Sequence, residues 1–91
     1  MSDNQYVRDN LMIIAAFRYC LGRMTYIVSD CAEWVIANWD DWPESVKKII
    51  RNDLEEAFKR DDEARLDGKE NKPLGWDYDR NQWERVRKLW K

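Results

Sequence analysis

Hydrophobic side chains recur at intervals of three and four residues along most of the chain, and nowhere do they alternate every second residue over a useful length. The first spacing lines one face of an α-helix, whereas the second is typical of a strand. Glycine and proline are scarce and fall between the periodic segments, at Gly22, Pro43, Gly68, Pro73 and Gly75, where they favour breaks. The sequence therefore predicts an all-α fold.

These breaks divide the chain into four expected helices. The first is expected at about residues 4–21, and the second begins between residues 25 and 29 and ends near residue 40. The third opens at "DDWPE" with Pro43 in its first turn, and the last begins with Asp79 as its cap. The third apolar stripe runs out in "KRDDEAR", where we expect a fraying helix end, followed by a loop at about 67–78. Asp79 with Gln82 three residues later matches a capping box. The prediction is a single domain over residues 1–91, a compact bundle of three helices plus a shorter C-terminal helix.

The first helix is apolar on nearly every side from Leu11 onward. A helix of this kind is buried by several neighbours. A chain of 91 residues has few elements to supply them, and small domains bury a modest share of their surface. We therefore expect a homodimer or a higher symmetric oligomer that forms through this helix.

The composition excludes most familiar hydrolase chemistry. The chain contains no histidine, which is the commonest general base at neutral pH and a frequent metal ligand. Glu-x-x-His metal elements and Cys-His or Ser-His nucleophiles are therefore absent. We expect a protein that is not an enzyme and that uses neither a metal nor a cofactor.

Charge and cysteine content bear on partners and location. The net charge of −2 gives no overall attraction to nucleic acid or to anionic membranes. The N-terminus lacks a basic region followed by a long apolar stretch, so we expect a cytoplasmic protein. Cys20 and Cys31 have no CxxC spacing and are interpreted as small buried hydrophobic residues rather than as a disulfide framework.

The segment "AFRYCLGRMTY" places Arg18 among apolar residues. On a helical wheel Arg18 falls near the centre of the stripe that includes Leu11, so it needs a partner. One interpretation is a buried ion pair with Asp30 or Glu33. The other is a binding pocket for an anionic, nucleotide-like ligand, in which two guanidinium groups hold phosphate and aromatic rings stack on a base. That pocket consists of Arg18, Tyr19, Arg23 and Tyr26.

Six tryptophans allow two interpretations. Large rings fill the core of a small domain, and tryptophan is also enriched at the energetic centres of protein interfaces. Trp76, in the Gly- and Pro-containing segment "GWDYD", is the best candidate for an interface. Trp42, Asp40 and Asp41, after the second helix, are further candidates for a partner-binding surface.

The segment "AFRYCLGRMTY" and the following "DCAEWVIANWD" resemble a family of small phage and prophage proteins that carry an FRYxLGRxTY-like segment before an acidic, tryptophan-containing helix. The resemblance covers residues 11–42. It implies a context rather than catalytic residues, because small phage proteins commonly blunt host defence. Three hypotheses follow: sequestration of a nucleotide-like defence signal, docking on a host protein in the manner of an anti-CRISPR inhibitor, or a small regulatory or structural role.

Overall fold

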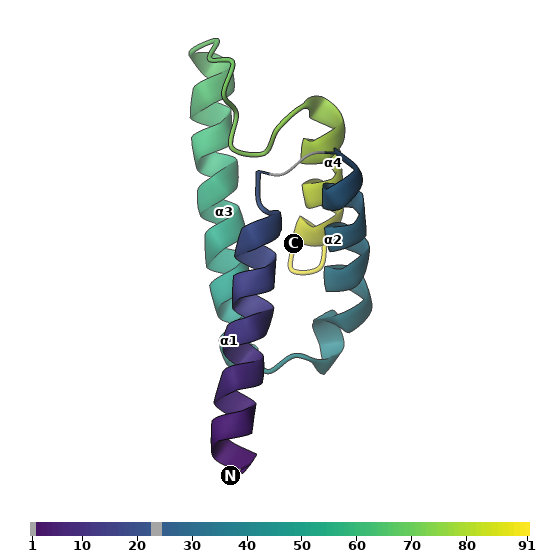
Figure 1. Ribbon diagram of the computed structural model, residues 1–91. Coiled ribbons are helices and arrows are strands. Elements are labelled where there is room, and N and C mark those ends of the chain that lie inside the picture. Colours follow the sequence, from purple (N-terminus) through teal and green to yellow (C-terminus); the bar gives the residue numbers. More distant parts are fainter. Residues whose placement is uncertain (1, 23–24) are drawn as a thin grey trace.

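The computed structural model describes the backbone of residues 2–22 and 25–91 and the side chains of residues 9–22 and 27–91. Within these residues the chain forms four α-helices and one 3-10 turn, without a strand, and this confirms the all-α prediction. In chain order the elements are α1 (Ser2–Cys20), α2 (Thr25–Asn38), the turn η1 (Trp39–Asp41), α3 (Glu44–Leu66) and α4 (Asp77–Arg87) (Figure 1).

The helices pack as two neighbouring pairs, α1 along α3 and α2 beside α4 (Figure 1). The core lies between the pairs, where Phe17 of α1 meets Trp83 of α4 edge to face with ring centres 5.6 Å apart. The molecule is elongated, 50 × 23 × 19 Å. Figure 1 shows why, because the N-terminal turns of α1 project beyond the other helices.

Four tryptophans close the end of the core near η1. Trp42 packs edge-on against Trp34 and Trp39, and the Trp39 ring also lies 5.3 Å from that of Trp90. Only 9% of the Trp42 surface is exposed. This placement corrects the assignment of Trp42 to a partner-binding surface, because the ring is used to fill the core.

The boundaries of the last two helices differ from the prediction. α3 does not fray at "KRDDEAR" but continues to Leu66, since Asp61 and Ala64 on its inner face are buried. α4 begins two residues earlier than expected, at Asp77. Asp79 lies in its first turn rather than before it. The connecting loop is therefore 67–76.

Cys20 and Cys31 form a disulfide, with their Cα atoms 6.3 Å apart. Both residues are buried as expected, but the interpretation as unbonded hydrophobic residues is wrong. The bond forms because the chain reverses after α1 and brings the last residue of that helix beside the middle of α2. No helix in the described part of the chain has a stretch long and apolar enough to cross a membrane.

Candidate functional site

Trp76 is the most exposed aromatic residue in the described part of the chain, with 74% of its surface accessible. It stands at the end of the loop that connects α3 to α4, directly after Gly75. A tryptophan buries a large apolar area when it is covered. An indole left in water at this position is therefore the side chain with most to gain from a contact.

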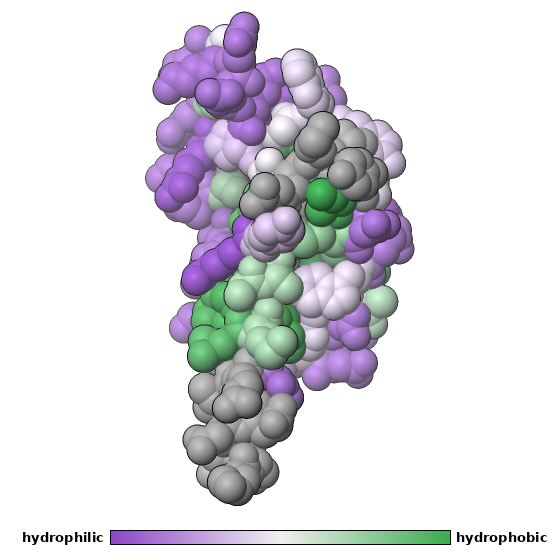
Figure 2. Space-filling model, viewed as in Figure 1, coloured by the Kyte–Doolittle hydropathy of each residue, from purple (hydrophilic) through white to green (hydrophobic). Residues whose placement is uncertain are grey.

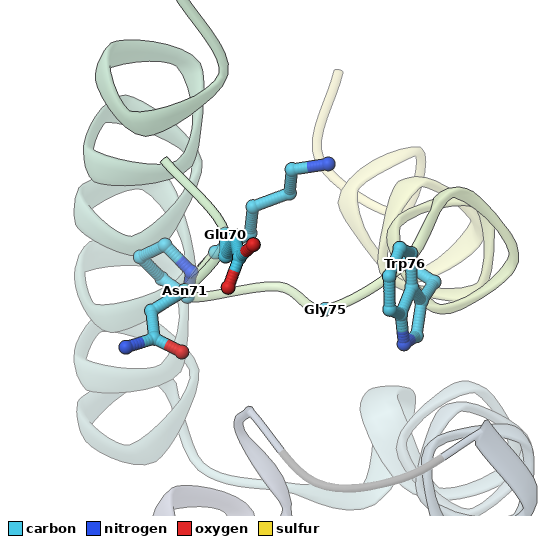
Figure 3. Close-up of a pocket in the computed structure, with 6 residues that line it drawn as sticks. Glu70, Asn71, Gly75 and Trp76 are labelled. Atoms are coloured by element: carbon cyan, nitrogen blue, oxygen red, sulfur yellow. The ribbon is translucent and has the colours of Figure 1, made fainter. Parts of the chain in front are cut away.

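The indole forms one wall of a shallow open pocket of about 460 Å³. Figure 3 shows Glu70 and Asn71 on one side, Trp76 on the other, and Gly75 between them. The Lys72 ammonium lies 5.5 Å from the centre of the indole ring. Such a pocket offers an aromatic surface between charges of both signs.

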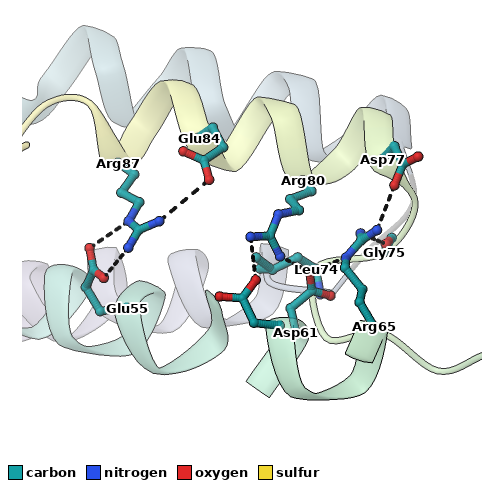
Figure 4. Close-up of polar contacts among 10 residues, drawn as sticks. Glu55, Asp61, Arg65, Leu74, Gly75, Asp77, Arg80, Glu84 and Arg87 are labelled. Carbon is teal, nitrogen blue, oxygen red and sulfur yellow. Dashed lines mark hydrogen bonds and ion pairs between the residues drawn. The ribbon is translucent and has the colours of Figure 1, made fainter. Parts of the chain in front are cut away.

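A buried carboxylate fixes the loop that carries Trp76 (Figure 4). Asp61 of α3 is fully buried and accepts a hydrogen bond from the Leu74 amide at 3.2 Å. It also accepts one from Arg65 Nε at 2.6 Å and one from Arg80 of α4. Asp61 thus joins α3, the loop and α4, and we call Asp61, Arg65 and Arg80 the Asp61 cluster.

The same cluster reaches the residues on both sides of Trp76. Arg65 donates to the Gly75 carbonyl at 2.8 Å and to the Asp77 carboxylate at 2.6 Å. The Trp76 amide donates to Asp79 Oδ2 at 3.1 Å. The Gly75 carbonyl, the Trp76 amide and the Asp77 carboxylate therefore each have a partner, and these contacts hold the backbone that carries the indole.

Gly75 is required by this arrangement. Its φ of 77° lies in the left-handed region, which other residues rarely adopt. A Cβ added at Gly75 would lie 2.6 Å from Asp79 Oδ2. The glycine thus allows the Asp79 carboxylate to approach the backbone and bind the Trp76 amide.

Electrostatics keep the cluster ionised. Burial alone would raise the pKa of the Asp61 carboxyl, but hydrogen bonds from Arg65, Arg80 and the Leu74 amide outweigh it and hold that pKa below its usual range. Arg80 also pairs with Asp62 at 2.6 Å and lies over the Phe58 ring at 5.0 Å. The cluster therefore stabilises the fold and positions the loop, and it leaves no acid or base poised for proton transfer.

The sequence contains a signal for this cluster that periodicity does not detect. Asp61 and Arg65 are spaced i, i+4, which suits a helical ion pair. Such spacing is usually found on a solvated surface, so it does not by itself predict a buried carboxylate. Burial of Asp61 depends on Arg80, which is 19 residues away.

Arg18 lies neither in the core nor beside its predicted partners. Its side chain is 59% exposed, and its Nε donates to Asp53 of α3 at 2.7 Å. Glu33, one predicted partner, pairs instead with Arg85 at 2.6 Å. The correction follows from packing: α1 lies along α3, so Arg18 meets an α3 carboxylate rather than one of α2.

Arg18 lines a pocket, but Tyr19 does not line it with Arg18. This shallow cavity of about 410 Å³ lies between α1, α3 and the loop, and its charged residues are Arg18, Asp53, Glu56 and Arg60. The two carboxylates offset the two guanidinium groups, because Arg60 pairs with Glu56 at 3.5 Å. The pocket therefore has no net positive charge to attract an anion.

The structure describes only some of the other predicted site residues. Tyr19 is exposed on α1, whereas Arg23 and the side chain of Tyr26 lie outside the described residues. Asp40 and Asp41 are exposed in η1. Figure 1 shows η1 and the Trp76 loop at opposite ends of α2, so Asp40 and Asp41 are not brought together with Trp76.

In the described part of the chain, no three His, Cys, Asp or Glu residues are grouped closely enough to hold a metal ion. No family model, no curated protein and no solved structure matches this chain.

Proposed function

We propose that this chain is a non-enzymatic binding protein that docks on a partner protein through Trp76. The observation that carries the proposal is an indole 74% exposed on a backbone held at both sides by the Asp61 cluster and by Asp79. Tryptophan is enriched among the residues that dominate binding energy. A preorganised loop loses little conformational freedom on binding, which favours affinity.

The surroundings of Trp76 indicate the chemistry of the partner. Glu70 lines the pocket beside the indole, and Asp77 follows Trp76 with its carboxylate largely exposed. Because the Lys72 ammonium also lies beside the indole, an apolar pocket on the partner with charges of both signs at its rim would complement this surface. The resemblance of residues 11–42 to phage proteins suggests the partner class, a defence protein in the cytoplasm of a bacterial host.

The test compares wild type, Trp76→Ala and Leu66→Ala as immobilised proteins in lysates of bacteria that carry defence systems. Leu66 is also exposed and serves as the matched control for loss of apolar surface. We expect a protein that wild type and Leu66→Ala retain and Trp76→Ala does not. With that partner purified, calorimetry should give a Kd at least tenfold weaker for Trp76→Ala, as for a hot-spot residue.

The fold of each variant is checked first, by circular dichroism and thermal denaturation. Trp76→Ala should melt within about 2 °C of wild type, because an exposed side chain contributes little to stability. A partner bound equally well by Trp76→Ala would contradict docking through the indole.

Sequestration of an anionic, nucleotide-like signal is the second candidate function. The observation in its favour is that Arg18 and Arg60 line the same pocket, and the pairing of both with carboxylates opposes it. Thermal denaturation with nucleotide mixtures separates the candidates. A sequestering protein is stabilised by its ligand, and the Arg18→Ala, Arg60→Ala double variant is not. A protein that only docks shows no shift in either form.

A further inference from the structure

The side of α1 that faces away from the core is apolar. Met12, Ala15 and Tyr19 follow each other at i, i+3 and i+7, and Leu11 and Ala16 flank them. These five residues form what we call the α1 outer face, and all of them are exposed. Leu11, Met12 and Tyr19 keep 61%, 63% and 61% of their surface accessible. Large exposed apolar patches are uncommon on monomers and mark interaction surfaces.

A groove continues this face toward α2. It has a volume of about 290 Å³ and is lined by Ala16, Cys20, Ile27, Asp30, Cys31 and Trp34. Asp30 is the one charged residue among them. Figure 2 shows hydrophobic surface along the middle of α1 and again beside α2 on the same side of the molecule. Ala16 belongs to both the outer face and the groove, so the two form one surface.

We propose that a second copy of this chain binds the α1 outer face and that the protein is a homodimer. The area that such a dimer would bury supports a second copy as the partner. Covering the outer face and the groove on two copies would remove roughly 1,000 Å² from water, which is the smallest area expected of a biological interface. Each copy buries the same patch in such a contact, as the two-fold symmetry of most homodimers requires.

Shape and charge also suit a copy of the same face. Ala15 and Ala16 lie at its centre, with Leu11 and Met12 toward one end and Tyr19 toward the other. A two-fold axis beside the alanines lets the small residues of the two helices approach closely, and it sets Met12 of one copy near Tyr19 of the other. Residues 10–17 contain no charge, so the contact between the two α1 helices sets no like charges together, and Asp30 is the one charged residue of the groove.

The charges that bound the face agree with the same symmetry. Asp9 precedes it and Arg18 belongs to its last turn. A two-fold axis between them places Asp9 of one copy near Arg18 of the other, where Arg18 already pairs with Asp53, and it sets the two helix dipoles antiparallel. A parallel arrangement would instead set like charges level with each other.

The dimer does not depend on the docking function. The outer face lies on α1, whereas Trp76 stands on the α3–α4 loop, so both surfaces are available at once. A dimer carries two Trp76 side chains and gains avidity for a partner that offers two sites within reach. Loss of the dimer would weaken that gain and leave the single Trp76 contact intact.

The test is sedimentation equilibrium between 5 and 200 µM, a range chosen to span a micromolar Kd. We expect a dimer for wild type. Ala15→Glu, which places two carboxylates beside the axis, should weaken the dimer at least 100-fold. Asn52→Glu makes the same charge change at an exposed position of α3 and should leave the dimer intact.

The proposal would be overturned by a monomeric wild type at 200 µM, by a dimer that survives Ala15→Glu, or by equal dissociation of both glutamate variants. Met12→Gln removes apolar surface at constant charge and similar size. It should weaken the dimer even if Ala15→Glu disturbs α1, whose helicity circular dichroism at low protein concentration reports. An unaltered dimer in Met12→Gln would also overturn the proposal.

Discussion

At the scale of single residues, the ion pair of Arg18 and the ion pairs of Asp61 should contribute differently to the free energy of unfolding. Arg18 pairs with Asp53 at the surface, where water screens the attraction and both side chains lose freedom on pairing. We expect Arg18→Ala to leave the midpoint of urea unfolding nearly unchanged. Asp53→Asn provides the control from the other partner. If Arg18→Ala lowered the free energy of unfolding as much as the loss of a buried ion pair does, Arg18 would have a structural role that its exposure does not explain.

Asp61 is buried, so its removal has a larger expected effect. Asp61→Asn leaves the guanidinium groups of Arg65 and Arg80 without their shared carboxylate. Breaking a buried charge pair in this way costs about 3–5 kcal/mol, and urea unfolding monitored by circular dichroism measures it.

The matched control for this change is Asp62→Asn. It removes an exposed carboxylate that also pairs with Arg80 and should cost less than about 1 kcal/mol. Equal effects of the two substitutions would contradict the structural role of the Asp61 cluster.

At the scale of helices, the disulfide between α1 and α2 is the feature most open to experiment. It closes a loop with a sequence separation of 11 residues, and cross-links of this kind stabilise folded proteins by about 2–4 kcal/mol. We expect dithiothreitol to lower the melting temperature of the wild type. The double variant Cys20→Ala, Cys31→Ala should melt at a lower temperature and be insensitive to the reductant.

Alkylation provides an independent readout of the same bond. The denatured, unreduced chain should take up no iodoacetamide label, and the reduced chain should take up one label at each cysteine. Labelling before reduction would contradict the disulfide. Because cytosolic reductants keep most thiols reduced, the result also bears on the predicted cytoplasmic location.

Helix positions were predictable from local signals, whereas side-chain partners were not. The 3.6-residue period and the breaks at Gly22 and Pro43 place α1, α2 and the start of α3, because those signals lie within a few residues of each boundary. The partner of Arg18 depends on which helix lies beside α1. The end of α3 depends on Asp61 contacts made across the loop. Such contacts join residues distant in sequence, and periodicity carries no information about them.

The candidate site shows the same division. Trp76 was predictable as an exposed residue because it follows Gly75 in a polar segment. Trp42, only three residues after Trp39, was not distinguishable as a core residue. Its burial results from packing against rings of α2 and η1.

At the scale of the whole molecule, ion pairs join α3 to α4. Besides the Asp61 cluster, Glu55 accepts two hydrogen bonds from Arg87 at 2.9 Å and one from Trp90 Nε1 at 3.1 Å. The Arg87 hydrogen bonds are the main cause that lowers the pKa of Glu55. Planar two-point contacts of this kind are among the stronger ion pairs in proteins. The attachment of α4, and with it the Trp76 loop, thus depends on carboxylates being ionised.

Stability should therefore fall in acid. The folded-state pKa values of Asp61 and Glu55 are both lowered, so the unfolded chain binds more protons than the folded one as the pH falls through the unfolded values. The contribution of these pairs is complete above the unfolded pKa values, about 3.9 for Asp and 4.3 for Glu, and is lost below them. We expect the free energy of urea unfolding to be nearly constant from pH 7 to about 5.5 and to decrease toward pH 3.

The Glu55→Gln variant tests the part of Glu55 in this decrease. It should be less stable than wild type at pH 7 and lose less stability on acidification, whereas Glu63→Gln, at an exposed position of α3, should follow wild type. A decrease of equal size in wild type and Glu55→Gln would mean that Glu55 titrates alike in the folded and unfolded chain, and would refute its part in holding α4 to α3.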